Sequence, residues 1–426
     1  MNKVVTLLLL GLFSTICYSN QDSYYFPTLG AQYSAYEATV VGTLPEVQAD
    51  LAKESPLVNQ RITIFPEREV PEPFFFDDQL NYSTAWQKNP APLVFLIAGT
   101  GASHNGRKNI DMARAFYHAG FHVVSLSSPT YMNFIVAASK NGVPGNAYED
   151  AKDLYRVMEA IWSQAKQDIK VSDFYLTGYS LGGFNSAFVS KLDEERRIFN
   201  FRKVLLINPP VSLYNSISLL DRMSQNIPGG PDNFNKFFEG LLQEIGHVYK
   251  KNDGVEMDSE FLFQAYKAVD PTNEELAALI GVSFRVSSAN LIYTSDIMTK
   301  SGFIVPKNVT MGINSSPGHY AIVSYQLGFT DYFHGYFYPY YKAQYPQLNR
   351  DGFTALMNLH ALESYFKNSS KIEVMHNVDD IILEPGEIDF FIRVFGDRAK
   401  IYPKGGHCGN MAHKDNVAHM VSVFKQ

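Results

Sequence analysis

Residues 178–183, Gly-Tyr-Ser-Leu-Gly-Gly, constrain the fold of this chain more than any other stretch. An apolar segment at 173–177 leads into them and predicts a strand, and residues 183–197 are compatible with a helix. In a G-x-S-x-G turn from strand to helix, a Cβ at either flanking position would clash with the sharply bent backbone, so both positions are glycine. The motif predicts a nucleophile elbow that exposes the Oγ of Ser180. A Gly-Ser turn in an ordinary α/β sheet is the alternative that the motif alone leaves open.

The segments around the elbow alternate between strand and helix patterns. The strand patterns are at 61–65, 80–86, 92–98, 122–126 and 203–207, and the helix patterns are at 110–119 and 146–167. The second helix carries its apolar residues on one face, which favours packing against a sheet. Right-handed crossovers would place Ser180 at the carboxyl end of a central parallel strand.

The loop at 99–103 follows a continuously apolar strand and is rich in small residues. Backbone N–H groups can approach a substrate oxygen closely only where side chains are small, so this loop is where an oxyanion hole would form. Thr100 is the first candidate donor, and the backbone N–H of Leu181, after the serine, is the second. A plain strand-to-helix turn is the alternative for this loop. A phosphate-binding loop would need a Gly-Lys-Ser/Thr ending, which residues 99–105 lack.

The amino-terminal sequence has the form of a signal peptide. A short basic start precedes an apolar run at 4–13 that is too short to cross a bilayer as a mature helix, and the small residues Cys17 and Ser19 fit a cleavage site. We expect residues 1–19 to be removed and the protein to be exported to the periplasm or secreted. Acylation of Cys17 is the alternative, although the bulky Ile16 suits a lipoprotein signal poorly.

Composition excludes several classes of protein. Without residues 1–19, Cys408 is the only cysteine, so no internal disulfide can form. The net charge is −7 with no basic run, which argues against a nucleic-acid partner. Beyond residue 19 no uninterrupted apolar stretch of about 18 residues occurs, so we expect no membrane span in the mature chain. The oligomeric state is left open.

After residue 210 the alternation stops until a buried-type strand at 371–375, and we interpret residues 214–369 as an inserted, largely helical cap. Helical patterns at 234–248 and from residue 273 support this interpretation. Eight aromatic residues lie between 329 and 341. The core of the insert is the favoured place for them, and the wall of a substrate pocket is the alternative. The insert as a whole could instead be a surface for oligomerisation or for a partner.

A candidate acid and a candidate base follow the insert. Asp379 and Asp380 end the strand at 371–375, and the local chemistry permits either to be the acid. A helix at 384–396 and a strand at 399–402 lead to His407 in a glycine-rich loop, before a final helix at 411–424.

The order serine, aspartate, histidine resembles the α/β-hydrolase superfamily, through the elbow, the Gly99-Thr100-Gly101 loop, the 379–383 turn and Gly405-Gly406-His407. The resemblance covers residues 60–213 and 370–426. It implies an α/β fold with a mostly parallel central sheet covered on both faces, in which residues 20–213 form the first part of the core and 370–426 the second. The family register of aspartate, any residue and two apolar residues favours Asp380 as the acid. Ala98-Gly99 replaces the family's frequent His-Gly.

The resemblance implies a serine hydrolase in which Ser180, Asp380 and His407 cleave a carboxylic ester through an acyl-enzyme, with no metal or organic cofactor. The expected partner is therefore a small ester or acyl substrate. A peptidase or amidase is the enzymatic alternative, and a binding protein on the same scaffold is the non-enzymatic one. Cys408 is interpreted as a packing residue.

Overall fold

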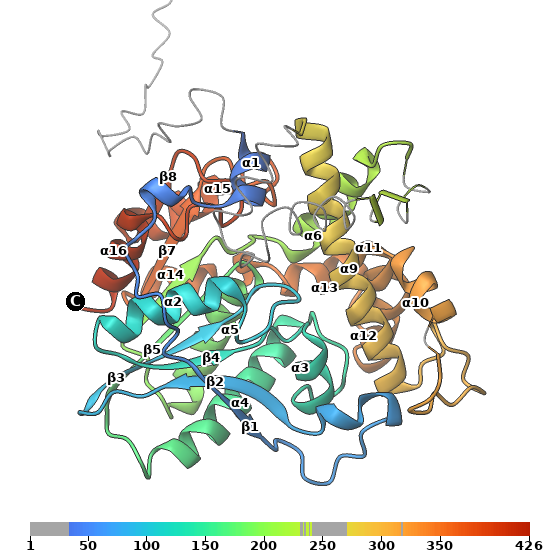
Figure 1. The fold of residues 1–426 in the computed structure, drawn as a ribbon, viewed down its shortest axis with the longest axis horizontal. Helices are drawn as coiled ribbons and strands as arrows, with labels where there is room; N and C mark the ends of the chain where they lie inside the picture. The colour runs from blue at the N-terminus through green and yellow to red at the C-terminus, as the bar shows by residue number, and fades with distance from the viewer. Residues whose placement is uncertain (1–33, 231–232, 234–235, 238, 241–270, 317) are drawn as a thin grey trace, which may run out of the picture.

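The computed structural model describes residues 34–230, 233, 236–237, 239–240, 271–316 and 318–426 (Figure 1). The predicted signal peptide at 1–19 therefore lies outside the described residues. So does most of the helical pattern predicted at 234–248.

An eight-stranded sheet forms the centre of the molecule. Its strands are β1 (Val58–Ile62), β2 (Leu80–Ala85), β3 (Ala91–Ile97), β4 (His122–Leu126), β5 (Val171–Tyr179), β6 (Lys203–Ile207), β7 (Ile372–Asn377) and β8 (Ala399–Tyr402). Their order is β1-β2-β4-β3-β5-β6-β7-β8. The pairs β1/β2 and β2/β4 are antiparallel, and all later pairs are parallel. The strand predicted at 61–65 begins and ends three residues earlier, because its pairing with β2 runs from Val58 to Ile62.

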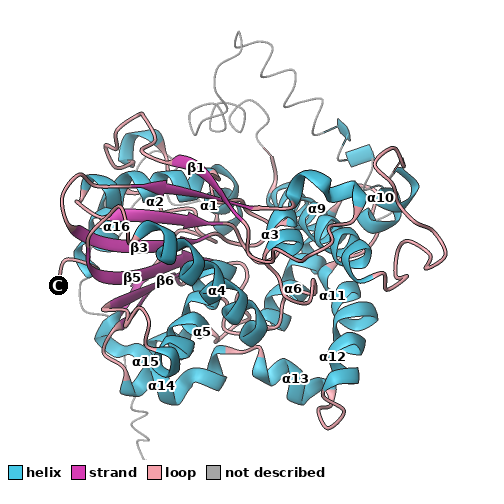
Figure 2. Cartoon of the chain, turned by 90° about the horizontal axis from the view of Figure 1, so that it is seen from below, coloured by secondary structure: helices cyan, strands magenta, loops and turns pink. Residues whose placement is uncertain are grey.

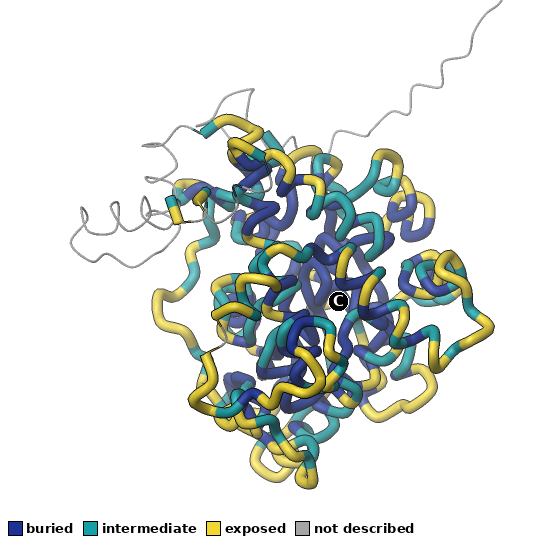
Figure 3. The backbone as a smooth tube through the Cα atoms, turned by 90° about the vertical axis from the view of Figure 1, so that its right-hand side faces the viewer, coloured by how far each residue is buried: buried dark blue, intermediate teal, exposed yellow. Residues whose placement is uncertain are grey.

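Helices cover both faces of the sheet (Figure 2). One face packs against α4 (Ala147–Ala165), α5 (Leu181–Arg196), α14 (Glu363–Asn368) and α15 (Ile388–Phe395). The other face packs against α2 (Arg107–His118) and α16 (Lys414–Val423). The alternate side chains of the central strands therefore belong to two separate hydrophobic clusters. The buried segments of the chain lie mainly in the interior of the molecule (Figure 3).

Several element boundaries differ from the sequence prediction. The helix predicted at 384–396 begins only at Ile388, because Gly386 has a φ of +89° and interrupts any earlier turn. The helix predicted at 411–424 begins at Lys414, with His413 as its N-cap. Five short elements lie outside the segment between β6 and β7: α1 (Ala35–Val41), η2 (Pro45–Val47), η3 (Glu72–Asp77), α3 (Met132–Ala137) and η8 (Gly396–Arg398).

The described parts of the chain between β6 and β7 form helices that are joined by loops, the longest described loop lying between Thr299 and Gly318. Its helices are α6 (Leu213–Met223), η4 (Ser224–Asn226), α9 (Asn273–Thr299), α10 (Gly318–Tyr325), α11 (Phe329–Tyr332), η6 (Phe333–Phe337), α12 (Tyr338–Gln344), α13 (Arg350–Leu356) and η7 (Leu359–Leu362), followed by α14. Of the eight aromatic residues between 329 and 341, six belong to one hydrophobic cluster, and Tyr338 and Tyr340 pack against it. The last part of the insertion packs with the sheet instead, because Leu359, Leu362 and Phe366 lie in the cluster of β6 and α5.

Helix α9 is the longest helix of the described chain, at 27 residues. It is long and apolar enough to cross a membrane by length and composition, with a mean hydropathy of 1.4 over its best window. In the structure 56% of that window is buried inside the protein, as in a core helix. It contacts α6, α10 and α3, so it is the helix around which the insertion is assembled.

Candidate active site

Ser180 lies in a strained turn between β5 and α5. Its φ of 56° and ψ of −126° are a conformation that side chains larger than glycine rarely adopt. A Cβ at Gly178 would lie 2.4 Å from the carbonyl oxygen of Gly182, and a Cβ at Gly182 would lie 2.1 Å from that of Ile97. The two glycines are therefore required by the turn, as the motif predicts. The N–H of Ser180 donates to the carbonyl of Ile207 at 2.8 Å and holds the turn against β6.

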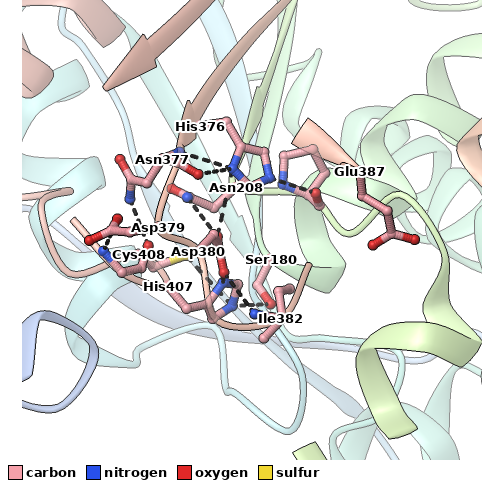
Figure 4. A network of polar contacts seen from close by, with 12 residues as sticks. Ser180, Asn208, His376, Asn377, Asp379, Asp380, Ile382, Glu387, His407 and Cys408 are labelled. Carbon is pink, nitrogen blue, oxygen red and sulfur yellow. Dashed lines mark hydrogen bonds and ion pairs between the residues drawn. The ribbon is translucent and has the colours of Figure 1, made fainter. Parts of the chain in front are cut away.

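The structure brings Ser180, His407 and Asp380 together (Figure 4). Nε2 of His407 lies 2.8 Å from Oγ of Ser180, and Nδ1 lies 3.0 Å from each carboxylate oxygen of Asp380. All three side chains are almost fully buried. This arrangement allows the imidazole to take a proton from the serine while the carboxylate fixes its orientation.

The neighbouring Asp379 points away from the histidine side chain. Its Oδ1 accepts the backbone N–H of Gly406 at 2.9 Å, so it fastens the histidine loop by its main chain. Burial raises the pKa of Asp379, although the hydrogen bonds from Gly406 and Gly405 oppose this. Of the two candidate acids, Asp380 is the one in contact with the imidazole.

Asp380 and His407 shift each other's pKa toward the charged form. Burial by itself would raise the pKa of Asp380, but His407 and its hydrogen bonds lower it below the usual value. Burial by itself would lower the pKa of His407, whereas the Asp380 carboxylate raises it above 6.5. Asp380 thus remains ionised beside an imidazole that holds a proton readily.

Three residues that contact the acid were assigned no role from the sequence. Nδ2 of Asn208, just after β6, donates to Oδ2 of Asp380 at 2.9 Å, and the N–H of Ile382 donates to Oδ1 at 3.1 Å. His376, at the end of β7, has its Nδ1 3.7 Å from Oδ2 of Asp380. Asn208 has a φ of +45°, which was not predictable from its sequence context.

His376 is held as a neutral imidazole. Its Nε2 lies 3.0 Å from the carbonyl of Pro209, which can only accept. Its Nδ1 lies 2.9 Å from the N–H of Asn377 and 3.3 Å from the carbonyl of the same residue, and the shorter of these two contacts favours a proton on Nε2. Burial lowers the pKa of His376, in agreement with this state. Because a neutral His376 carries no charge, it does not compete with His407 as the ion-pair partner of the Asp380 carboxylate.

The site decides the fold class. A serine in a strained elbow at the end of β5, an aspartate after β7 and a histidine after β8 meet above a sheet in the order β1-β2-β4-β3-β5-β6-β7-β8. The chain has the α/β-hydrolase fold.

Comparisons with known proteins were made for the whole sequence. Scans against protein-family models and curated proteins gave no match. Solved α/β-hydrolase structures similar to this chain include Est1E from Butyrivibrio proteoclasticus, with 12% identity and a TM-score of 0.37 over 82% of this chain and 96% of that one. A proline iminopeptidase from Mycobacterium smegmatis has 14% identity and a TM-score of 0.40 over 84% and 97%. A carboxyl esterase from Bacillus coagulans has 12% identity and a TM-score of 0.38 over 87% and 98%. Values this low carry no information about the substrate.

The two candidate oxyanion donors lie at the edge of one pocket. Leu181 is the first residue of α5, and the first N–H groups of a helix have no acceptor within it. In the loop at 99–103, the N–H of Gly101 donates to Oγ1 of Thr130 and that of Ala102 to the carbonyl of Gly99. No hydrogen bond of the Thr100 N–H occurs within the described part of the chain, so Thr100 is a donor that this loop can still offer.

The pocket lies between the sheet and the insertion and has a volume of about 550 Å³, including its open mouth. Its walls are almost entirely apolar, and they come from the core loops and from the insertion: Thr100, Thr130, Pro144, Gly145, Leu181, Leu213, Tyr214, Ile217, Leu291, Phe329, Tyr332, Phe333, Phe337 and Met357. None of these residues is an acid, a lysine, an arginine or a histidine. Four of the eight clustered aromatic residues therefore line the pocket as well as belonging to the core of the insertion.

Cys408 lies beside the histidine but is not placed as a nucleophile. It is buried in the cluster under α2 and α16, and its Sγ lies 3.9 Å from Nε2 of His407. Among the described residues, no group of three or more histidine, cysteine, aspartate or glutamate side chains is arranged to hold a metal ion.

Proposed function

We propose that this protein is a serine hydrolase that cleaves carboxylic esters with an apolar acyl part. The observation that carries the proposal is the apolar pocket, which begins at Thr100 and Leu181, directly beside Ser180. A pocket without ionisable acid or basic groups favours a neutral, apolar substrate group.

In the proposed mechanism His407 takes the proton from Ser180 as Oγ attacks the ester carbonyl. Asp380 stabilises the imidazolium and holds its tautomer. The N–H groups of Thr100 and Leu181 would bind the oxyanion, an effect of about 3–4 kcal/mol for each donor in comparable enzymes. The imidazolium then protonates the leaving alcohol, and water hydrolyses the acyl-enzyme by the same steps in reverse.

The lining of the pocket favours an ester over a peptide. An aminopeptidase needs a carboxylate to hold the substrate ammonium, and a carboxypeptidase needs a cation for the terminal carboxylate. Neither group is found among the described residues that line the pocket. Peptide bonds would also leave amide groups against an apolar wall, where an unpaired polar group is costly.

Fluorophosphonate labelling and a matched substrate panel test the proposal. The mature protein is expected to label at Ser180 and to hydrolyse p-nitrophenyl esters, with kcat/KM rising with acyl length until the pocket is filled. Anilides of the same acyl groups are expected to react far more slowly. Ser180→Ala is the control for labelling. A folded wild-type protein that does not label would leave only the binding-protein alternative, and faster cleavage of anilides would favour an amidase.

We further propose that the chain is exported, from the signal-peptide pattern of residues 1–19. Expression in a host with a general secretory pathway, followed by mass spectrometry of the exported protein, tests this. A mature chain that starts at Asn20 is the expected result. Retention of Met1 on intact cytoplasmic protein would contradict it, and an acylated Cys17 would replace it with a lipoprotein.

A further inference from the structure

We propose that helix α1 positions the catalytic histidine, and that Thr39 is the positioning residue through which it acts. This inference rests on the proposed role of His407 as the general base. Helix α1 lies outside the two segments that resemble the α/β-hydrolase superfamily, and its sequence predicted no role for it. In the structure it lies beside the C-terminal part of the chain (Figure 1).

Thr39 bonds directly to the main chain of the histidine. Its Oγ1 accepts the backbone N–H of His407 at 2.8 Å and donates its own proton to the carbonyl of Ala35 at 2.7 Å. The second bond uses the only proton of the hydroxyl, so a lone pair is left for the N–H of His407. Thr39 therefore fixes the backbone of His407 as Asp380 fixes its ring.

The glycines on either side of His407 are explained by the same helix. Gly406 has a φ of +54°, and a Cβ there would lie 2.2 Å from the carbonyl oxygen of Ala35. A Cβ at Gly409 would lie 2.0 Å from the carbonyl oxygen of Ala38. The histidine loop is glycine-rich because the backbone of α1 lies against it, in addition to the demands of its own turns.

The opposite side of α1 contacts the insertion. Tyr36 and Val40 pack against a cluster formed by α6, α9 and the turn after the acid: Leu220, Met223, Ala277, Ile280 and Ile382. One short helix thus touches the insertion on one side and the histidine loop on the other. Seven residues are too few to form a stable helix alone, so the capping box of Ser34 and Glu37 and these contacts hold α1 in place.

The test compares Thr39→Val, which removes the hydroxyl but keeps the shape, with Thr39→Ser, which keeps the hydroxyl. We expect Thr39→Val to lower kcat roughly 10- to 100-fold with little change in KM, since small displacements of a catalytic group have effects of this size. Thr39→Ser is expected to stay within about threefold of wild type, as one retained hydrogen bond requires. Thr294→Val is the matched control, because it removes the same type of hydroxyl bond to a carbonyl one helical turn back, at 2.7 Å in α9.

A second readout separates positioning from stability. If α1 holds the imidazole against Asp380, Thr39→Val weakens that contact, and the pKa of His407 falls toward 6.5. The acid limb of the pH profile, and the His407 ring titration followed by NMR, should both move to lower pH. A folded Thr39→Val protein with unchanged kcat and unchanged His407 titration overturns the proposal. If Thr39→Val does not fold, Tyr36→Ala replaces it and should produce the same shift. The NMR titration needs no turnover, so it distinguishes failure of this inference from failure of the proposed hydrolase activity.

Discussion

Both carboxylate oxygens of Asp380 lie 3.0 Å from Nδ1 of His407. The preceding residue, Asp379, binds a backbone N–H of the same loop instead. The two aspartates therefore hold different parts of one loop, the ring of the histidine and its main chain.

Asp380→Asn should be far more damaging to activity than Asp379→Asn. An asparagine at 380 cannot stabilise the imidazolium and favours the wrong tautomer, so kcat should fall by about 10⁴-fold, as in serine proteases. An asparagine at 379 can still accept the N–H of Gly406 through its amide oxygen, and kcat should stay within about threefold of wild type. Steady-state kinetics on a p-nitrophenyl ester measure both. Greater damage from Asp379→Asn would move the assignment of the acid by one residue.

Activity should be lost on acidification, with a midpoint above pH 6.5. The general base must be neutral, and the Asp380 carboxylate raises the pKa of His407 above that value against the opposing effect of burial. As pH falls through this pKa the imidazole is protonated, so kcat/KM decreases. In Asp380→Asn the midpoint of the residual activity should move to lower pH. A wild-type midpoint below 6.5 would show that the carboxylate does not act on His407 as the distances indicate.

Phe337→Leu should shift the preference toward longer acyl groups. Phe337 is buried and lines the pocket, and a smaller side chain leaves room for additional substrate atoms. Each methylene that becomes buried adds about 0.8 kcal/mol, or roughly fourfold in kcat/KM. The control is Tyr336→Phe, because the hydroxyl of Tyr336 donates to the carbonyl of Ser295 and the residue does not line the pocket. An acyl-length profile that is flat in wild type and unchanged in Phe337→Leu would favour the insertion as an interaction surface.

His104 should make the fold sensitive to mild acid. It is buried, its Nδ1 lies 2.6 Å from Oγ of Ser83, and burial lowers its pKa to about 4. The unfolded chain takes up a proton near pH 6.5, whereas the folded chain does so only near 4, so stability present above 6.5 is lost as pH falls between these values. From pH 7.5 to 5 the loss should be about 2 kcal/mol.

Urea unfolding at these two pH values tests this in wild type, His104→Gln and the exposed-site control His118→Gln. The difference in unfolding free energy between the two pH values should shrink by about 2 kcal/mol in His104→Gln. If His104→Gln and wild type lose equal stability between the two pH values, other titrating groups cause the acid sensitivity.

The sequence by itself determined the features that depend on local geometry. The elbow at Ser180 was predictable because the turn excludes a Cβ at positions 178 and 182. Only glycine lacks a Cβ, so the requirement is visible in the sequence as two glycines at a fixed spacing. The strands β4, β6 and β8 were predicted at their observed bounds, because short apolar runs bounded by polar or turn residues carry their own signal. The α/β class followed from their alternation with helices.

Only the tertiary structure decided the features that join distant parts of the chain. The local chemistry of the sequence permits either Asp379 or Asp380 to be the acid, and only the family register favoured Asp380; the fold separates them by placing one carboxylate on the imidazole and the other on the backbone. The packing of α6, α9 and η6 decided which aromatic residues of the core of the insertion also line the pocket. Thr39 lies 368 positions from His407, and no local pattern records a contact that forms only when the two ends of the chain meet.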